Sequence, residues 1–271
     1  MDLGLRGKNA LITGGGRGIG KAIAMALARE GVNIAIASRN PEHETVQEIE
    51  GCGIKAYRLC VDVSTESQVV NMVREAIGIF GHLDFYVNNS ANFWHESVTK
   101  ITTENWRKTL DTNLSSCIWA CREVSKHLIE RRQGSILIVS STIQFHPAYQ
   151  ESSYRITKVG LKAYAENLAI ELAPFGIRVN VLSPGIMYTK MSSQNLDIVM
   201  NDPVLKESLL SSIPIGRLGQ PDECGAAAAL LLSDKVSSYT TGADIVIDGG
   251  YRLRPQTITH TTKEAIERLN L

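Results

Sequence analysis

Short apolar runs rich in β-branched residues alternate along the chain with longer stretches whose apolar residues recur at helical spacing. This alternation is typical of a parallel sheet with helices on both faces, a doubly wound α/β fold. The predicted strands, which would form one seven-stranded sheet, are Asn9–Thr13, Asn33–Ser38, Lys55–Val61, Asp84–Asn88, Ser135–Ser140, Arg178–Leu182 and Asp244–Asp248. The predicted helices are Ile19–Glu30, Glu42–Glu50, Glu66–Phe80, Glu104–Arg132, Ser153–Pro174 and Asp222–Ser233.

The pattern shows no repeat and no Pro- or Ser-rich linker, so residues 1–271 are expected to form a single domain. Residues 185–217 have a mixed pattern and are predicted to carry short helices, either as a segment that covers the substrate or as a structural excursion. Residues 251–271 form a threonine-rich tail that either closes over a neighbouring subunit or is frayed.

The charge balance argues against two classes of partner. With 28 basic and 28 acidic side chains, the chain has no broad positive field for nucleic acid or an anionic membrane. No apolar run approaches the ~20 residues that cross a bilayer, and the start of the chain lacks secretory features, so a cytoplasmic protein is expected. The five cysteines form no CxxC pair. Cys117 and Cys121, four residues apart on a predicted helix, are interpreted as packing residues, and no metal site is expected.

A glycine-rich turn joins the first predicted strand to the first predicted helix. The residues from Thr13 to Gly20 read TGGGRGIG. Glycines let the backbone bend tightly and approach a pyrophosphate, whose charge is stabilised by the free N–H groups at the helix start. In this strand-to-helix context the turn predicts a dinucleotide-binding (Rossmann) site.

The end of the second predicted strand bears on the choice of cofactor. An acidic residue there would bind a ribose diol and repel a phosphate, but this chain has Ser38 and Arg39. Arg39 and Arg17 could pair with a 2′-phosphate, which favours NADP(H), with NAD(H) still possible. The alternative is that both are solvated surface arginines.

Tyr154 and Lys158 share one face of a predicted helix because they are four residues apart. A neighbouring ammonium favours the phenolate and would bring the tyrosine pKa towards neutrality, as acid–base catalysis requires. Ser141 follows an apolar strand and is expected at the carboxyl edge of the sheet, where ligands bind in open α/β folds. Asn113 lies within the predicted helix Glu104–Arg132, where an asparagine taken alone is more often solvent-facing or locally bonded.

Taken together, these motifs resemble the short-chain dehydrogenase/reductase family over nearly the whole chain. The similarity extends to Asn88–Asn89, to Pro184–Gly185, to the segment GRLGQPDE at 216–223 and to Thr241–Gly242 with Asp248–Gly250. Within the family the chain is similar to 3-oxoacyl-acyl-carrier-protein reductases and glucose 1-dehydrogenases. The resemblance implies an enzyme that moves a hydride between NAD(P)(H) and a carbonyl or secondary alcohol such as an oxoacyl group, a sugar or a small ketone. It also implies a homotetramer.

The resemblance assigns roles to individual residues. Tyr154 would exchange the proton with the substrate oxygen, and Ser141 would hydrogen-bond that oxygen. Lys158 would hold the nicotinamide ribose, Asn113 would position a water, and Asn88 would stabilise the sheet edge. The positions expected to contact the cofactor are Gly14, Gly16, Arg17, Gly18, Ile19, Gly20, Ser38, Arg39, Asp62, Val63, Asn89, Tyr154, Lys158, Pro184, Gly185, Ile186 and Thr189.

Two departures from the family pattern stand out. Ala91 occupies a position where the family usually has glycine, so the backbone there must tolerate a methyl group or shift. The segment between Ser141 and Tyr154 contains bulky residues but no glycine and is expected to border the substrate; its His146 is either a substrate contact or a packing or surface residue. A rival function for the whole chain is a redox sensor or scaffold that binds the cofactor without turnover.

Overall fold

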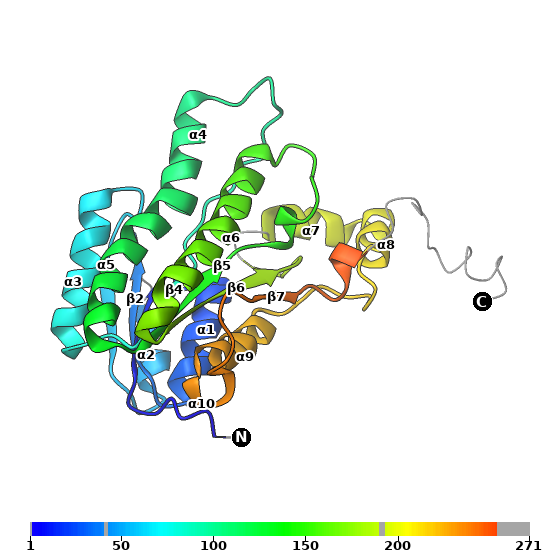
Figure 1. Cartoon of the computed structure of the whole chain (residues 1–271). Coiled ribbons are helices and arrows are strands. Elements are labelled where there is room, and N and C mark those ends of the chain that lie inside the picture. Colours follow the sequence, from blue (N-terminus) through cyan, green and yellow to red (C-terminus); the bar gives the residue numbers. More distant parts are fainter. Residues whose placement is uncertain (1, 41–42, 190–192, 254–271) are drawn as a thin grey trace.

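The computed structural model describes residues 2–40, 43–189 and 193–253, and these contain one seven-stranded sheet (Figure 1). All neighbouring strands are parallel, in the order β3-β2-β1-β4-β5-β6-β7. The strands are β1 (Asn9–Thr13), β2 (Asn33–Ser38), β3 (Ala56–Cys60), β4 (Phe85–Asn88), β5 (Gly134–Val139), β6 (Ile177–Pro184) and β7 (Asp244–Ile247). The predicted doubly wound Rossmann fold is therefore confirmed, and each predicted strand is present.

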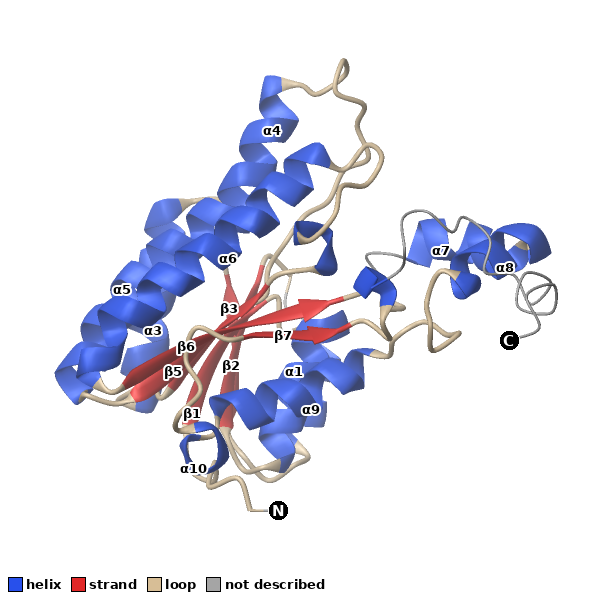
Figure 2. Cartoon of the chain, turned by 45° about the vertical axis from the view of Figure 1, so that its right-hand side comes forward, coloured by secondary structure: helices blue, strands red, loops and turns tan. Residues whose placement is uncertain are grey.

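Helices cover both faces of the sheet (Figure 2). The side chains of α3, α5 and α6 form an apolar core with one face, and those of α1, α2 and α9 form a second core with the other. The helices are α1 (Gly18–Arg29), α2 (His43–Glu50), α3 (Glu66–Phe80), α4 (Thr103–Leu110), α5 (Ser116–Arg131), α6 (Ser152–Leu172), α7 (Ser193–Asn201), α8 (Pro203–Ser211), α9 (Pro221–Leu232) and α10 (Asp234–Ser237).

The strands β1, β2, β4 and β5 are largely apolar on both faces because both faces are covered. In β1, Leu11 belongs to the core under α3 and α5, while its neighbours Ala10 and Ile12 belong to the core under α1 and α9. Successive side chains of a strand point to opposite faces, so an unbroken apolar run supplies both cores. This explains why the strands were recognisable in the sequence as continuous apolar stretches.

Helices α1 and α9 approach each other closely through a glycine. A Cβ atom added at Gly225 of α9 would lie 2.6 Å from the carbonyl oxygen of Ala22 in α1. No side chain larger than hydrogen fits there without moving one of the helices. Gly225 therefore fixes the position of α1, the helix that begins at the glycine-rich turn.

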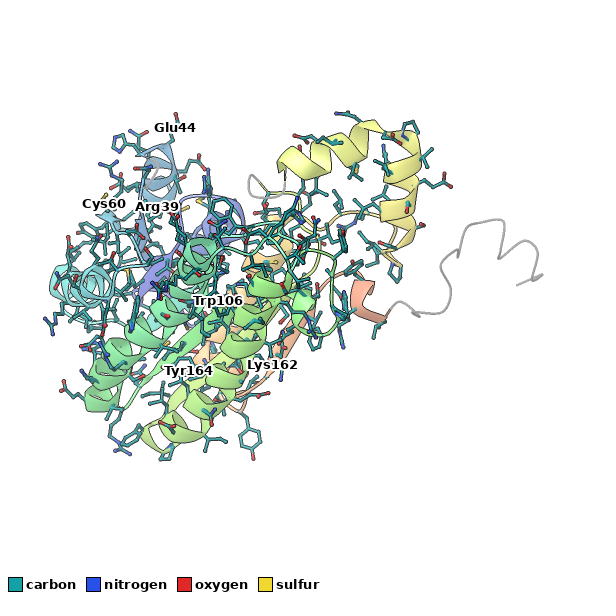
Figure 3. All side chains as sticks on the ribbon, turned by 90° about the horizontal axis from the view of Figure 1, so that it is seen from above. Arg39, Glu44, Cys60, Trp106, Lys162 and Tyr164 are labelled. Atoms are coloured by element: carbon teal, nitrogen blue, oxygen red, sulfur yellow. The ribbon has the colours of Figure 1, made fainter. Side chains whose placement is uncertain are left out.

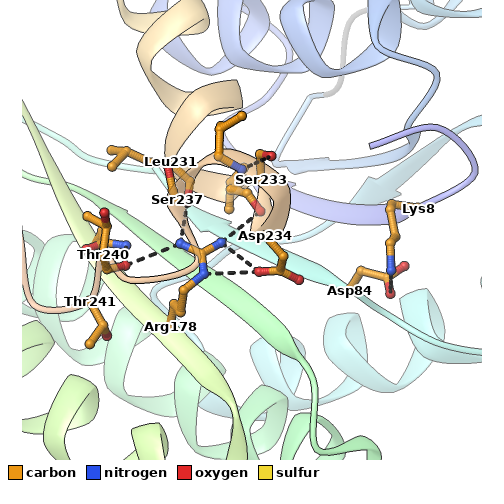
Figure 4. A network of polar contacts seen from close by, with 12 residues as sticks. Lys8, Asp84, Arg178, Leu231, Ser233, Asp234, Ser237, Thr240 and Thr241 are labelled. Carbon is orange, nitrogen blue, oxygen red and sulfur yellow. Dashed lines mark hydrogen bonds and ion pairs between the residues drawn. The ribbon is translucent and has the colours of Figure 1, made fainter. Parts of the chain in front are cut away.

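A buried arginine of β6 caps the carboxyl end of α9 (Figure 4). The guanidinium of Arg178 donates to the carbonyls of Leu231 and Leu232 at 2.7 and 3.0 Å and to that of Thr240 at 3.3 Å. It also donates twice to the carboxylate of Asp234, at 2.9 and 3.0 Å. A cation at a helix carboxyl end satisfies carbonyls that have no partner within the helix and opposes the helix dipole.

The prediction of one continuous helix over Glu104–Arg132 is wrong. A π-helical segment, Asp111–Ser115, separates α4 from α5. Asn113 lies in this segment and is fully buried, which excludes the solvent-facing alternative. In the wider π turn the Asn113 side chain forms hydrogen bonds with Asn92 and Thr157. Such contacts with distant segments cannot be predicted from a local sequence pattern.

The segment 185–217 contains the short helices α7 and α8, as predicted (Figure 1). Asp202 caps α8 by accepting hydrogen bonds from the N–H groups of Val204 and Leu205 at 2.9 and 3.0 Å. Of the predicted tail, the turn Tyr251–Leu253 is described, and residues 254–271 lie outside the described part of the chain. None of the helices in the described ranges is both long and apolar enough to cross a membrane.

Candidate active site

The glycine-rich turn between β1 and α1 has a geometry that requires glycine. Gly14 and Gly18 have φ angles of 66° and 54°, in the left-handed region that side chains disfavour. A Cβ atom on Gly20 would overlap the carbonyl oxygen of Gly14. The turn therefore brings bare backbone to the start of α1.

The first turn of α1 has N–H groups without a side-chain cap. Its N-cap residue, Arg17, makes no capping hydrogen bond with its side chain, and no acidic residue lies in the first turn. The N–H groups of an uncapped helix start, together with the helix dipole, favour an anion. The backbone at this turn therefore fits the pyrophosphate of a dinucleotide.

Asn89 holds the glycine turn from the end of β4. Its side-chain amide donates to the carbonyls of Thr13 and Gly14 at 3.1 and 3.2 Å. The hydroxyl of Thr13 accepts in return from the N–H groups of Asn89 and Ser90, at 3.0 and 3.2 Å. The structure thus shows Asn89 supporting the turn. The methyl group of Ala91 is tolerated, since Arg132 and Gln150 are the non-glycine residues with positive φ among those described.

Arg39 follows β2 and lies near Cys60 at the end of β3 (Figure 3), whereas Arg17 is the N-cap residue of α1. Arg39 and Arg17 are both exposed, and the thiol of Cys60 donates to the carbonyl of Arg39 at 3.1 Å. Burial by itself would raise the pKa of Asp62. Hydrogen bonds from the hydroxyl and N–H of Ser64, helped by the charge of Arg39, outweigh that effect and lower the pKa. Asp62 is therefore a carboxylate with one oxygen engaged by Ser64 at 2.7 and 3.0 Å.

Tyr154 and Lys158 lie one turn apart near the start of α6, as predicted. The ammonium of Lys158 is 5.4 Å from the centre of the Tyr154 ring and donates to the carbonyl of Val139 at 2.9 Å. The carbonyl of Lys158 accepts from Ser140 at 3.0 Å, which ties α6 to the end of β5. Ser141 follows directly and interacts with Tyr154 through its hydroxyl. The structure therefore gathers the phenol, the ammonium and the serine hydroxyl at the carboxyl edge of the sheet.

The pKa values at this site differ from the expectation that Lys158 brings the tyrosine towards neutrality. Burial raises the pKa of Tyr154 well above its usual value, the charge of Glu151 adds to this effect, and the Ser141 hydroxyl opposes it. Burial also lowers the pKa of Lys158 to about 8. In the protein alone, desolvation is the largest influence on the pKa of both groups.

Asn113 joins the π-helical segment to α6. Its amide oxygen accepts from the N–H of Asn92 at 2.7 Å, and its amide nitrogen donates to the carbonyl of Asn92 at 2.9 Å and to the Thr157 hydroxyl at 3.2 Å. Thr157 in turn donates to the carbonyl of Tyr154 at 2.7 Å. Asn113 is thus connected through one residue to the backbone that carries Tyr154.

The loop after β6 returns to the glycine-rich turn. Close contact with Asp248 leaves no room for a side chain at Gly185. Thr189 faces Gly18, since a Cβ atom on that glycine would lie 3.5 Å from the Cβ of Thr189. Ile186 packs with Leu196 and Leu218 in a third apolar cluster. A cavity of about 540 Å³ opens beside Gly18 and Thr189. The structure therefore places Thr189, at the end of this loop, beside the glycine-rich turn.

Two residues near Tyr154, Phe93 and Glu151, were missed by the motifs. The Phe93 ring packs edge-on against Tyr154, with 5.0 Å between ring centres. Glu151 immediately precedes α6 and affects the pKa of Tyr154. His146 packs against Tyr251 at 5.4 Å, which is the packing interpretation left open above. No motif marks such positions, although their closeness in sequence to Asn89 and Tyr154 is a weak signal.

Comparison with known proteins identifies the family to which the chain belongs. A family model described as enoyl-(acyl carrier protein) reductase matches residues 14–252. The chain is 34% identical to the 3-oxoacyl-(acyl-carrier-protein) reductase of Chlamydia pneumoniae over 92% of this chain and 99% of that protein. The chain belongs to the short-chain dehydrogenase/reductase family. It is therefore an oxidoreductase of a family that uses NAD(P)(H) and acts on carbonyl or alcohol substrates.

Solved structures of this family superpose closely on the chain. A short-chain alcohol dehydrogenase described as putative, from Sinorhizobium meliloti 1021, has a TM-score of 0.89 and 30% identity, covering 94% of this chain and 100% of that one. The L-sorbose reductase of Gluconobacter frateurii, solved with NADPH and L-sorbose, has a TM-score of 0.88 and 28% identity, covering 93% and 98% of the two chains. The short-chain dehydrogenase/reductase fold thus extends over nearly the whole chain.

Proposed function

We propose that this dehydrogenase/reductase prefers NADP(H) and uses Tyr154 as its acid–base residue. The observation that carries the proposal is the gathering of Tyr154, Lys158 and Ser141 at the carboxyl edge of the sheet, with the Lys158 ammonium 5.4 Å from the phenol ring. When bound, the nicotinamide supplies the hydride for reduction or accepts it in oxidation. The substrate is a carbonyl compound in one direction and a secondary alcohol in the other.

The residues of the chain carry the proton chemistry. In reduction Tyr154 donates its proton to the carbonyl oxygen as the carbonyl carbon accepts the hydride, and Ser141 donates a hydrogen bond to the same oxygen. Lys158 holds the ribose and stabilises the phenolate that forms, with its ammonium oriented by the Val139 carbonyl. Asn113 orients a water from within the π-helical segment.

The proposed cofactor site follows the carboxyl edge of the sheet from β3 to β6. The pyrophosphate lies on the backbone of the Gly14–Gly20 turn, and Asp62 and Val63 face the adenine. Pro184, Gly185, Ile186 and Thr189 face the nicotinamide. Ser38, Arg39 and Arg17 surround the ribose position that carries a 2′-phosphate in NADP. Both guanidinium groups are exposed, which supports the preference for NADP. One oxygen of the nearby Asp62 carboxylate is already bonded to the Ser64 hydroxyl.

The remaining parts of the proposal concern the surroundings of the site. Helices α7 and α8, which lie beyond the carboxyl ends of the strands in Figure 2, form the substrate-covering segment within residues 185–217. The exposed apolar side chains Ile118 on α5, Val159 and Ile170 on α6 and Ile245 on β7 support a homotetramer. We further propose a single-domain, cytoplasmic protein.

The decisive experiment for the reaction is Tyr154→Phe, which removes the exchangeable proton and keeps the ring. We expect turnover to fall below a few per cent of wild type, while the affinity for NADPH, measured by fluorescence titration, stays within about twofold. Retained turnover would contradict the role of Tyr154. The rival function of a sensor would be supported if the wild-type protein bound NADPH but did not oxidise it in the presence of any ketone, aldehyde or sugar tested.

The cofactor preference is tested by Arg39→Asp. An acidic side chain repels the 2′-phosphate and accepts hydrogen bonds from a ribose diol. We expect NADPH affinity to fall at least tenfold while NADH affinity stays equal or improves. Arg58→Asp is the matched control, because it makes the same charge change at an exposed position in the middle of β3. Equal affinity of the wild type for both cofactors would contradict the preference.

A further inference from the structure

Glu151 is a half-buried carboxylate at the start of the catalytic helix. It immediately precedes α6, and its carbonyl accepts the N–H of Arg155 at 2.9 Å, so its backbone continues the first helical turn. Residues three apart on a helix are neighbours on the same face. Glu151 therefore lies about one helical turn before Tyr154, close enough for its charge to act on the phenol.

The position of Glu151 is set by a second loop. Gln150 adopts a left-handed backbone conformation with a φ of 61°, and its carbonyl accepts the N–H of Glu96 at 3.0 Å. The same loop carries Phe93, which covers one edge of the Tyr154 ring. A non-glycine residue with positive φ is held only where the surrounding contacts determine it. The turn before α6 is therefore fixed by the loop that also covers the phenol.

Within the described residues, the carboxylate of Glu151 has no hydrogen-bond or ion-pair partner. Its side chain is not used to cap α6, and burial is the cause that raises its pKa. A partly desolvated carboxylate without a donor is unfavourable until a donor reaches it. The Glu151 charge also raises the pKa of Tyr154, as expected of two groups that face the same space.

We propose that Glu151 is a specificity-determining residue that accepts a hydrogen bond from a hydroxyl group next to the reacting carbonyl, so that the enzyme prefers hydroxy ketones of the polyol or sugar class. The inference rests on the proposed role of Tyr154, whose phenol marks the position of the carbonyl oxygen. A hydroxyl on the neighbouring carbon would supply the donor that Glu151 lacks.

The charges around the site favour a neutral hydroxyl over charged alternatives. The Glu151 carboxylate repels a substrate with an acidic group beside its carbonyl. The Lys158 ammonium, 5.4 Å from the Tyr154 ring, repels an amino ketone. A neutral hydroxyl donates to Glu151 without bringing a like charge near either group.

The test compares small ketones of matched size with NADPH. Hydroxyacetone and butanone differ by a hydroxyl in place of a methyl group, whereas pyruvate and aminoacetone place a negative or a positive charge in the same region. We expect wild-type kcat/KM to be at least tenfold higher for hydroxyacetone than for butanone, because a hydrogen bond to a charged group contributes about that factor. Pyruvate and aminoacetone should be poorer than hydroxyacetone.

The Glu151→Gln variant keeps the shape of the side chain and removes its charge. We expect it to reduce the preference for hydroxyacetone over butanone about tenfold, mainly by loss of activity on hydroxyacetone, and to improve turnover of pyruvate. Glu171→Gln, an exposed change on the same helix, is the matched control and should leave the preference unchanged. Melting temperatures confirm that each variant folds.

The outcomes separate this inference from the proposed function. Turnover of butanone and hydroxyacetone with equal kcat/KM, or a Glu151→Gln variant with an unchanged preference, overturns the inference and leaves the reaction assignment standing. A higher kcat/KM for aminoacetone than for hydroxyacetone overturns it in favour of a cationic substrate. Absence of NADPH consumption with every ketone contradicts the proposed function itself.

Discussion

The side-chain amide of Gln144 donates to the hydroxyl of Ser183 at 2.6 Å and thereby ties the turn after β5 to the end of β6. The same amide donates to Asp244 of β7 at 3.0 Å, and Ser183 donates to the other oxygen of that carboxylate at 2.6 Å. Gln144 is three residues from Ser141, and Ser183 immediately precedes Pro184. This buried network therefore links the segment that follows Ser141 to the loop proposed to face the nicotinamide.

Gln144→Glu is expected to destabilise the protein in a pH-dependent way. Burial already raises the pKa of Asp244, and a second carboxylate beside it raises the pKa of the pair further. A group whose folded pKa is raised stabilises the protein at low pH and loses that contribution as pH rises through the folded pKa. The variant should therefore melt close to wild type at acidic pH and well below it at pH 8.

The control for this prediction is the double variant Gln144→Glu with Asp244→Asn. It keeps one amide and one carboxylate in the network and exchanges their places. We expect the double variant to recover most of the stability and turnover lost at pH 8 by the single change. An equal loss in both variants would mean that the network does not act through this pair.

Gly20→Ala should damage both cofactor binding and stability. Its methyl group would overlap the Gly14 carbonyl, so the glycine-rich turn must shift. We expect the free energy of unfolding to fall by about 1–3 kcal/mol and the NADPH affinity to fall at least tenfold. Gly78→Ala is the matched control, because it lies in α3 with nothing within 4 Å of the added atom. It should stabilise the protein by up to about 1 kcal/mol and leave affinity unchanged.

Lys158→Met should abolish activity and yet stabilise the cofactor-free protein near neutral pH. Burial lowers the pKa of Lys158 from 10.5 to about 8, so below pH 8 the folded state carries the full desolvation cost of the ammonium. Allowing for the lost hydrogen bond to Val139, we expect a gain of about 2 kcal/mol at pH 7.

The sign of this effect is tested by its pH dependence. As pH rises from about 8 to 10.5, the folded wild type loses its proton before the unfolded chain does, so its stability increases relative to the variant. Urea titrations of both proteins at pH 7 and pH 10 should show the advantage of the variant shrinking. A constant difference, or a variant less stable at pH 7, would contradict the desolvation argument.

Arg178→Met should lower the free energy of unfolding by about 3 kcal/mol, because it leaves buried carbonyls at the end of α9 without donors. Arg178 has 8% side-chain exposure, whereas Arg122 pairs with Glu66 and Glu123 at 46% exposure. Arg122→Met, as the control, should leave the free energy of unfolding nearly unchanged, because solvent screens an exposed ion pair. Chemical denaturation of the two variants separates a buried cap from a surface ion pair.

The sequence was most informative where chemistry depends on local spacing. Tyr154 and Lys158 are four residues apart, so a helix places them on the same face. The bend at Gly14–Gly20 depends on the glycines within it, which adopt positive φ angles. Strands β1, β2, β4 and β5 were predictable because burial on both faces makes them largely apolar. These features do not depend on distant parts of the chain.

The features missed in the sequence depend on contacts between distant segments. The π-helical segment at Asn113 involves hydrogen bonds to Asn92 and Thr157, and no local pattern predicts it. The same holds for Gln144 and Asp244, which are 100 residues apart. The pKa expectation for Tyr154 was incomplete because the sequence shows the neighbouring ammonium and not the degree of burial.

The contact between Gly225 and Ala22 makes the glycine-rich turn at the start of α1 sensitive to a substitution at Gly225, a residue that no ligand would touch. A methyl group on Gly225 would press against the backbone of α1 and displace the bend at its start. A mutational scan scored by cofactor affinity should therefore reveal two separate sensitive regions, one at the phosphate-facing turn and another on the far side of its helix. Redesign of cofactor preference would have to hold the α1–α9 spacing constant while changing the side chains that read the ribose.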